Sequence, residues 1–157
     1  MIEKITPECR LEMEKIWFTA DLHAGHPKIV DICSRPTTRE EHDEWLIKEV
    51  FNKYVKAKDE VYLLGDISFL KRNLSQQFVA KLNGNKHLIL GNHDKNVEHL
   101  GNWKSVSQIK DFTFSRYGLN IHIVLCHYPI TSWNRKVHGS WHLYGHVHGR
   151  LKNEGIS

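Results

Sequence analysis

Twelve histidines are distributed over the 157 residues, and several stand in short polar clusters that also contain aspartate. Imidazole is the commonest metal ligand in proteins, and carboxylate and amide oxygens bind the same divalent metals. The clusters are, in chain order, Asp21-Leu22-His23, Gly65-Asp66, Gly91-Asn92-His93-Asp94, Cys126-His127 and Gly145-His146-Val147-His148. Each one follows a stretch of apolar residues. Their residue types and order indicate a metal site assembled from five loops.

The apolar stretches before the clusters predict β-strands, and the segments between them predict helices. The predicted strands cover 16–20, 60–64, 86–90 and 141–144, with a hairpin at 112–116 and 120–125 that turns at Tyr117-Gly118. Helices are predicted at 7–15, 38–55 and 74–82, the last capped by Asn73 and ended by Gly84. The helix at 38–55 has the clearest pattern, because Leu46, Val50 and Tyr54 recur at four-residue spacing.

This order of elements predicts an α/β fold. Strands and helices alternate in the first two-thirds of the chain, which is typical of βαβ units in a partly parallel sheet. The locally paired strands of the last third predict an antiparallel portion, so mixed sheets are expected. In open α/β sheets, ligands bind at the carboxyl ends of the strands, which is where all five clusters stand.

Composition excludes several classes of protein. Hydrophobic residues make up 40% and charged residues 25% of the chain, as in an ordinary soluble domain. No apolar stretch approaches the roughly 18–20 residues that span a bilayer, and no signal peptide is evident. Three widely spaced cysteines without a CxxC pair predict reduced thiols and a cytoplasmic location. The net charge of +4 favours an anionic ligand without indicating nucleic acid.

The five clusters together resemble the motifs of the calcineurin-like metallophosphoesterases. These are D-x-H, G-D, G-N-H-[DE], a histidine followed two residues later by proline (His127 and Pro129), and G-H-x-H. The resemblance covers about residues 17–150 and is strongest with small bacterial and phage members. It implies one metallophosphoesterase domain over 1–157, with 1–15 as an extension. It also implies a double-β sandwich flanked by helices.

The resemblance further implies a binuclear metal centre. One ion would be held by Asp21, His23, Asp66 and His148, and the other by Asp66, Asn92, His127 and His146, with Asp66 bridging. A hydroxide between the ions would attack phosphorus in line. Nitrogen and oxygen donors without thiolate suit two divalent transition metals, namely manganese, iron, zinc, cobalt or nickel, better than magnesium or calcium.

Other residues of the clusters have weaker assignments. By resemblance, His93 is a general acid or a stabiliser of charge, and Asp94 orients it and favours its imidazolium form. His26 is a candidate for contact with phosphate or with a ligand. Arg35 is a candidate phosphate clamp, with a surface ion pair as the alternative. Cys126 is expected in the core, and four histidines are expected to be structural, namely His42, His87, His99 and His122. Solvent exposure is expected of Arg135, His138 and His142 unless they line the cleft.

The function expected from these residues is hydrolysis of phosphate esters, and of phosphodiesters in particular. No insertion is long enough to form a lid, so an open cleft should admit the second ester arm. The alternatives are a nuclease, a phosphomonoesterase and a metal-binding scaffold without activity. The expected partner is a phosphate ester, with nucleotides and nucleic acids among the candidates, and no membrane. Family members usually have another strand beyond G-H-x-H, whereas only nine residues follow His148, so both a monomer and a homodimer are expected.

Overall fold

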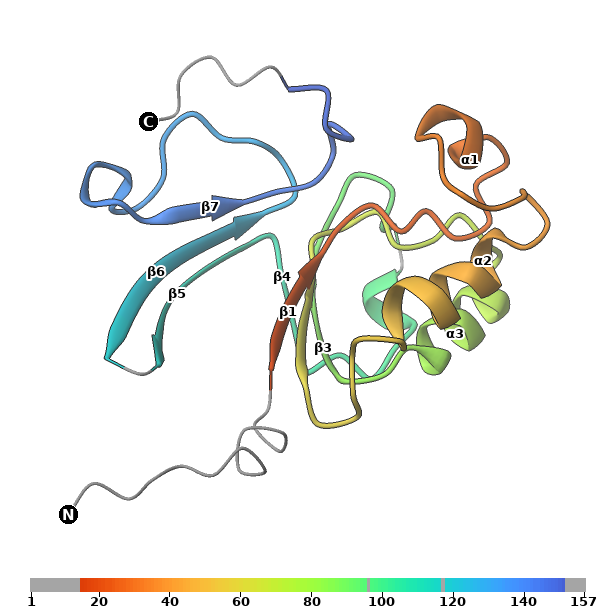
Figure 1. Ribbon diagram of the computed structural model, residues 1–157, viewed down its shortest axis with the longest axis horizontal. Coiled ribbons are helices and arrows are strands. Elements are labelled where there is room, and N and C mark those ends of the chain that lie inside the picture. Colours follow the sequence, from red (N-terminus) through yellow and green to blue (C-terminus); the bar gives the residue numbers. More distant parts are fainter. Residues whose placement is uncertain (1–14, 96, 117, 152–157) are drawn as a thin grey trace.

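The computed structural model describes residues 15–95, 97–116 and 118–151, and the structural statements below concern these residues. The helix predicted at 7–15 therefore lies outside them, apart from Lys15. The first sheet has four strands, all parallel, in the order β1-β2-β3-β4 (Figure 1). Its strands are β1 (Ile16–Thr19), β2 (Glu60–Leu63), β3 (Asn85–Ile89) and β4 (Ser105–Ser107).

The second sheet pairs β5 (Ile109–Arg116) antiparallel with β6 (Leu119–Cys126), and β7 (Trp141–Leu143) runs parallel to β6. The predicted α/β fold with a two-sheet sandwich is confirmed. Antiparallel pairing is confined to the hairpin, because the connections in the first sheet cross over and return each strand in the same direction. Arg116 pairs with Leu119, as expected at the end of the predicted hairpin, and Tyr117 of the predicted turn lies outside the described residues.

The helices lie on the face of the first sheet that points away from the second sheet (Figure 1). They are α1 (Ile29–Ile32), α2 (His42–Trp45), its π-helical continuation η2 (Leu46–Phe51) and α3 (Arg72–Lys81), with the short 3-10 turn η3 (Val97–His99). A further 3-10 turn, η4 (Lys136–His138), lies instead in the connection between β6 and β7. The helices in the described part of the chain are all too short or too polar to span a bilayer.

Successive side chains of β2 point to opposite faces of the first sheet and so belong to two separate layers of the core. Val61 and Leu63 face the helices, whereas Tyr62 and the following Leu64 face the second sheet, where they meet residues such as Leu125. Both layers are well buried, and Val61, Leu63 and Leu125 have no exposed surface. The strand ends that leave this core are thereby held in fixed positions, which is what a site built on loops requires.

Several predicted boundaries were wrong. The helix predicted at 38–55 begins at His42, because the Thr38 hydroxyl accepts a hydrogen bond from the Glu41 amide and holds the preceding turn. It also becomes π-helical before ending at Phe51. Asn73 is not a cap, since α3 already begins at Arg72. The elements α1, β4, η3 and η4 were not predicted, because three or four residues are too few to show a periodic pattern.

Three of the histidines expected to be structural make contacts within the fold. His87 lies 2.6 Å from a Glu60 carboxylate oxygen and His122 lies 2.6 Å from one of Asp111. His42 is buried beside Asp43.

Candidate metal centre

The five polar clusters meet at one end of the two sheets, where β1, β2, β3, β6 and β7 end (Figure 1). Backbone hydrogen bonds join the loops directly. The amide of Asp21 donates to the carbonyl of Gly65 at 3.0 Å, and the amide of Gly145 donates to the carbonyl of His127 at 3.0 Å. Segments such as those of Asp21 and His146, which are 125 residues apart in sequence, are thus brought into one site.

One group of donors consists of Asp21, His23 and His148, whose ligand atoms all lie within 4.8 Å of one another. Nε2 of His23 is 3.2 Å from Nε2 of His148 and 3.7 Å from an Asp21 oxygen. Burial raises the pKa of Asp21, but the His23 ring and a hydrogen bond from the His146 amide outweigh it, so this pKa lies below its usual value. Burial lowers the pKa of His148. Both effects favour the forms that bind metals, a carboxylate and a neutral imidazole.

The other group consists of Asp66, His127 and His146, again with ligand atoms within 4.8 Å. The Asn92 side-chain oxygen lies between the two rings, 3.0 Å from Nε2 of His127 and 3.0 Å from Nδ1 of His146. Nδ1 of His127 is 2.7 Å from the carbonyl of Leu64, so it carries the proton and donates it there. The lone pair on Nε2 of His127 consequently faces the Asn92 oxygen.

Asp66 lies between the two groups and is almost completely buried. Its Oδ2 atom is 3.8 Å from Nε2 of His23 and 3.6 Å from Nε2 of His127. Lone pairs of nitrogen and oxygen therefore converge from both sides on the same carboxylate. Buried acceptors that face one another need a cation between them, and this donor set fits divalent metal ions bound through nitrogen and oxygen.

The backbone of the site is strained. Five of the seven predicted ligands have positive φ, a conformation that is uncommon for residues other than glycine: Asp21 (54°), His23 (54°), Asp66 (55°), His146 (69°) and His148 (49°). Such conformations cost on the order of 1–3 kcal/mol each and concentrate at functional sites. Their concentration at these five positions is independent support for a functional role of the clusters.

Two glycines of the clusters permit the close approach of the loops. A methyl group on Gly91 would overlap the Asp66 carboxylate, and one on Gly65 would lie 2.6 Å from the Cα atom of Gly91 and from Nδ1 of His127. The glycines that begin these motifs are thus needed for packing, which the motif pattern alone does not explain.

His93 stands at the mouth of the site. Its side chain is 47% exposed, and its Nε2 atom is 4.0 Å from Oδ2 of Asp66. Its amide donates a hydrogen bond to the other Asp66 oxygen at 2.9 Å. The ring is thus near the shared carboxylate and open to solvent, the placement expected of a group that meets a substrate rather than a metal.

Asp94 does not orient His93. Its buried carboxylate accepts hydrogen bonds from the amides of Asp66 and Gly91, both at 2.8 Å, and of Ile67 at 2.9 Å. Burial raises the pKa of Asp94, and the three amide hydrogen bonds act in the opposite direction. The residue instead clamps the loop after β2 to the loop after β3, which corrects the role inferred from its position beside His93.

His26 lies at the edge of the first group, with its ring centroid 5.7 Å from that of His23. Burial lowers the pKa of His26, and the neighbouring His23 and His93 lower it further. Its Nδ1 accepts the amide hydrogen of Lys28 at 3.2 Å, so the proton of the neutral ring is on Nε2. Phe69, which was not predicted, packs against all three histidines at centroid distances of 4.7–5.3 Å.

Arg35 supports the first cluster from outside. Its guanidinium donates to the carbonyls of Asp21 at 2.6 Å and of Leu22 at 2.7 Å, and it contacts Nε2 of His42 at 2.5 Å. These contacts correspond neither to the phosphate clamp nor to the surface ion pair expected from the sequence. This role could not be predicted, because the carbonyls that Arg35 contacts are 13 and 14 residues away and no sequence pattern indicates the contact.

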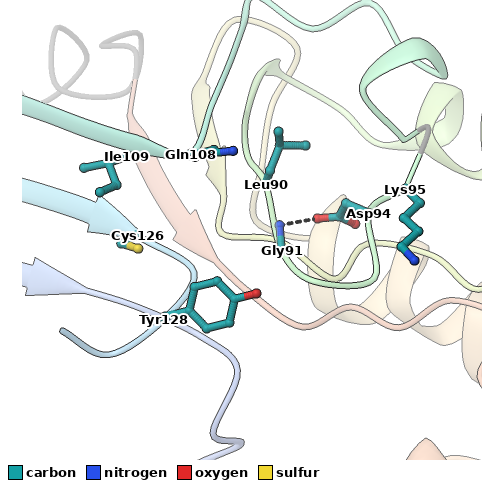
Figure 2. Close-up of a pocket in the computed structure, with 8 residues that line it drawn as sticks. All are labelled: Leu90, Gly91, Asp94, Lys95, Gln108, Ile109, Cys126 and Tyr128. Carbon is teal, nitrogen blue, oxygen red and sulfur yellow. Dashed lines mark hydrogen bonds between the residues drawn. The ribbon is translucent and has the colours of Figure 1, made fainter.

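A pocket of about 490 Å³ that is partly open to solvent lies beside the site, lined by Leu90, Gly91, Asp94, Lys95, Gln108, Ile109, Cys126 and Tyr128 (Figure 2). Figure 2 shows the Asp94 carboxylate directed to the Gly91 amide at its edge. The Tyr128 ring lies 5.0 Å from the ring of His127 and 4.9 Å from that of His146, so it borders both the pocket and the second group of donors. Cys126 is buried, as predicted.

Three residues between the Cys126-His127 cluster and the Gly145–His148 cluster are also candidates for lining the cleft. Arg135 and His138 are exposed, as predicted. His142 is half-buried, with Nδ1 3.1 Å from the carbonyl of Val124, and has a structural role.

Comparison with known proteins agrees with this site. A family model described as calcineurin-like phosphoesterase matches residues 14–150. An uncharacterized protein of Methanocaldococcus jannaschii is 32% identical over 147 residues, which cover 92% of this chain and 75% of the relative. The gene 66 protein of Mycobacterium phage L5 is 29% identical, over 88% of this chain and 80% of its own length. A crystal structure of a protein of unknown function from Aquifex aeolicus has a TM-score of 0.55 and 26% identity, and the match covers 74% of this chain and 62% of that one.

Proposed function

This chain belongs to the calcineurin-like phosphoesterases, a family of metal-dependent hydrolases of phosphate esters, and we propose that it cleaves phosphodiesters with a pair of divalent metal ions. The observation that carries the proposal is the position of Asp66. One of its oxygens lies within 3.8 Å of an imidazole nitrogen from each donor group. A single carboxylate can bind two cations, and two cations at one site can act together on one phosphate.

The proposed ligands are those expected from the motifs. Asp21, His23, Asp66 and His148 would hold one ion, and Asp66, Asn92, His127 and His146 the other. Bound metals would supply an activated water and neutralise charge on the phosphoryl oxygens. The Leu64 carbonyl accepts a hydrogen bond from Nδ1 of His127, which orients the ring and leaves Nε2 free to bind a metal.

His93 is the proposed general acid. An exposed imidazole 4.0 Å from the shared carboxylate can reach the leaving oxygen of a bound ester and deliver a proton from Nε2. His26 is proposed to donate a hydrogen bond from Nε2 to a phosphoryl oxygen, because its Nδ1 is already occupied by the Lys28 amide. Phe69 packs against both rings and restricts their orientation.

Two features favour a diester over a monoester. A monoester dianion carries one more negative charge, and the cation expected to bind it, Arg35, donates instead to two backbone carbonyls. The mouth of the site is open, with both His93 and His146 exposed, which leaves room for ester groups on both sides of phosphorus. A singly charged, two-armed phosphate fits these conditions better than a dianion.

The test is a comparison of substrates with the metal-free protein supplied with Mn²⁺. We expect a higher kcat/KM for bis-p-nitrophenyl phosphate than for p-nitrophenyl phosphate, with 2′,3′-cyclic nucleotides and a short oligonucleotide assayed in parallel. A preference for the monoester would overturn the diesterase proposal and leave the metal centre intact. Absence of hydrolysis with every divalent transition metal would overturn both.

A further inference from the structure

The thiol of Cys33 touches a proposed metal ligand. Its sulfur lies 3.1 Å from Nδ1 of His148, 115 residues away in sequence. On the other side of the same ring, Nε2 lies 3.2 Å from Nε2 of His23. The His148 ring is therefore held between a sulfur atom behind it and the first donor group in front of it.

The position of Cys33 is fixed by the helix that precedes it. Its amide donates to the carbonyl of Ile29 at 3.0 Å, and α1 is anchored in the core by the buried side chains of Ile29 and Val30. Two residues further on, Arg35 donates to the carbonyls of the Asp21 loop. The segment 29–35 thus supports the first donor group at two points, through Cys33 and through Arg35. Both of these contacts are to the first group and not to the second.

A neutral imidazole carries one proton, so a ring that offers Nε2 to a metal must carry its proton on Nδ1. For His148, the atom placed to accept that proton is the sulfur of Cys33. We infer that Cys33 is a positioning residue, which accepts a hydrogen bond from Nδ1 of His148 and so keeps Nε2 free to bind a metal at the Asp21–His23–His148 group. This inference rests on the proposed function, because it takes His148 as a metal ligand.

The proposed ligand histidines differ in this support. The Leu64 carbonyl accepts a hydrogen bond from Nδ1 of His127, whereas Nδ1 of His23 is buried without a hydrogen-bond partner among the described residues. Groups that orient a metal-bound histidine typically contribute about 10–100-fold to metal affinity. The thiol should therefore have a large effect on metal affinity at the first group, because the other histidine of that group, His23, has no group among the described residues that accepts a hydrogen bond from its Nδ1.

Two measurements on Cys33→Ala test the inference. In the metal-free protein, long-range proton–nitrogen NMR should show the proton of His148 on Nδ1, and in the variant a shift toward Nε2. His127, held by a backbone carbonyl, is the internal reference and should keep its proton on Nδ1 in both. Calorimetric titration with Mn²⁺ alone should show one of two binding steps weakened by about 10–100-fold and the other unchanged.

Two further variants separate a positioning role from a general effect of packing. Cys33→Ser keeps an acceptor at the same place and should recover most of the lost affinity. Ile32→Ala removes an exposed neighbouring side chain on the same helix and should leave both binding steps as they are. If Cys33→Ala does not fold, the NMR spectrum of the unmodified protein still decides, because a proton on Nε2 of His148 contradicts the inference.

Other outcomes would also overturn it. Equal Mn²⁺ affinities in Cys33→Ala and the unmodified protein would mean that the thiol has no such role. A sulfur-to-cobalt charge-transfer band in the Co²⁺-loaded protein that disappears in Cys33→Ser would make Cys33 a ligand itself. If the unmodified protein binds no Mn²⁺, the proposed function fails instead, and the NMR spectrum still reports on the hydrogen bond.

Discussion

Replacing Asp94 with alanine should destabilise the protein even when no metal is bound. The carboxylate is 2% exposed, and it accepts three backbone hydrogen bonds, from Asp66, Ile67 and Gly91. In Asp94→Ala these three amides lose their acceptor while they remain in the interior. The loop after β2 and the loop after β3 would then be joined by the hydrogen bond from the His93 amide to Asp66 and by the strands that precede them.

The expected loss follows from the number of bonds and the burial. A hydrogen bond to a charged group contributes about 1.5–3 kcal/mol, and three of them set an upper limit of roughly 4–9 kcal/mol. Removing the buried carboxylate also removes its cost of desolvation, the same effect that raises the pKa of Asp94. We therefore expect a loss of about 3–5 kcal/mol for Asp94→Ala, and about half of that for Asp94→Asn, which keeps one acceptor oxygen.

The assay is urea unfolding of the metal-free protein, because bound metal would add its own contribution to the measured free energy. Asp31→Ala is the matched control, since its carboxylate is exposed and pairs with the exposed Arg39, and such surface pairs contribute about 0–1 kcal/mol. If the free energy of unfolding of Asp94→Ala is within about 1 kcal/mol of that of the unmodified protein while hydrolysis is lost, Asp94 acts on the reaction itself. Its assignment as a clamp between the two loops would then be wrong.

Three further outcomes are expected. Asp66→Asn should weaken metal binding at both positions, by more than the roughly 10–100-fold typical of residues that only support a ligand; metal analysis after dialysis that shows full loading would contradict a shared ligand. His93→Ala should keep its metals and lose about 10²–10⁴-fold in kcat, with a smaller loss for a p-nitrophenolate leaving group; an equal loss for alkoxide leaving groups would indicate charge stabilisation. Burial raises the pKa of Asp59, but hydrogen bonds from the amides of Lys56 and Lys15 and from the Trp17 indole lower it below the unfolded value. Its contribution to stability is therefore present above about pH 4 and is lost as the pH falls through the folded pKa. Asp59→Asn should cost about 1–3 kcal/mol at pH 7 in urea unfolding, and an equally large difference at pH 3 would refute this explanation.

The sequence contains what is needed to predict the strands and the clusters at their ends. After Glu60, strand β2 and the residue that follows it are a run of buried residues, Val61 to Leu64, and the polar cluster begins where the chain leaves the core, so Asp66 could be placed from local pattern alone. The five clusters then converge because the strands that precede them all end at the same end of the two sheets. The motif order added the division of ligands into two groups, which contacts such as those of Asp66 support.

The residues that support the ligands could not be predicted in the same way. Asp94 is adjacent to His93 in sequence, yet its side chain turns to amides 27 and 28 residues away. Arg35 contacts a loop 13 residues before it, and Cys33 contacts a histidine 115 residues after it. No local pattern in the sequence encodes either pairing. Short elements such as α1 are fixed by tertiary contacts, because four residues are too few to form a stable helix alone.

These supports explain how strained ligand loops persist in the folded chain. Each ligand with positive φ, such as Asp21 or Asp66, costs on the order of 1–3 kcal/mol, and metal binding is one source of compensation. The structure contains another that needs no metal: Asp94 fixes the amides of the Asp66 loop, and Arg35 fixes the carbonyls of the Asp21 loop. The geometry of the proposed ligands is therefore set by the polypeptide itself, and we expect metal affinity to depend also on residues that do not touch a metal. Substitutions at Asp94, Arg35 and Cys33 should for this reason perturb the site, but by less than substitution of the shared carboxylate Asp66.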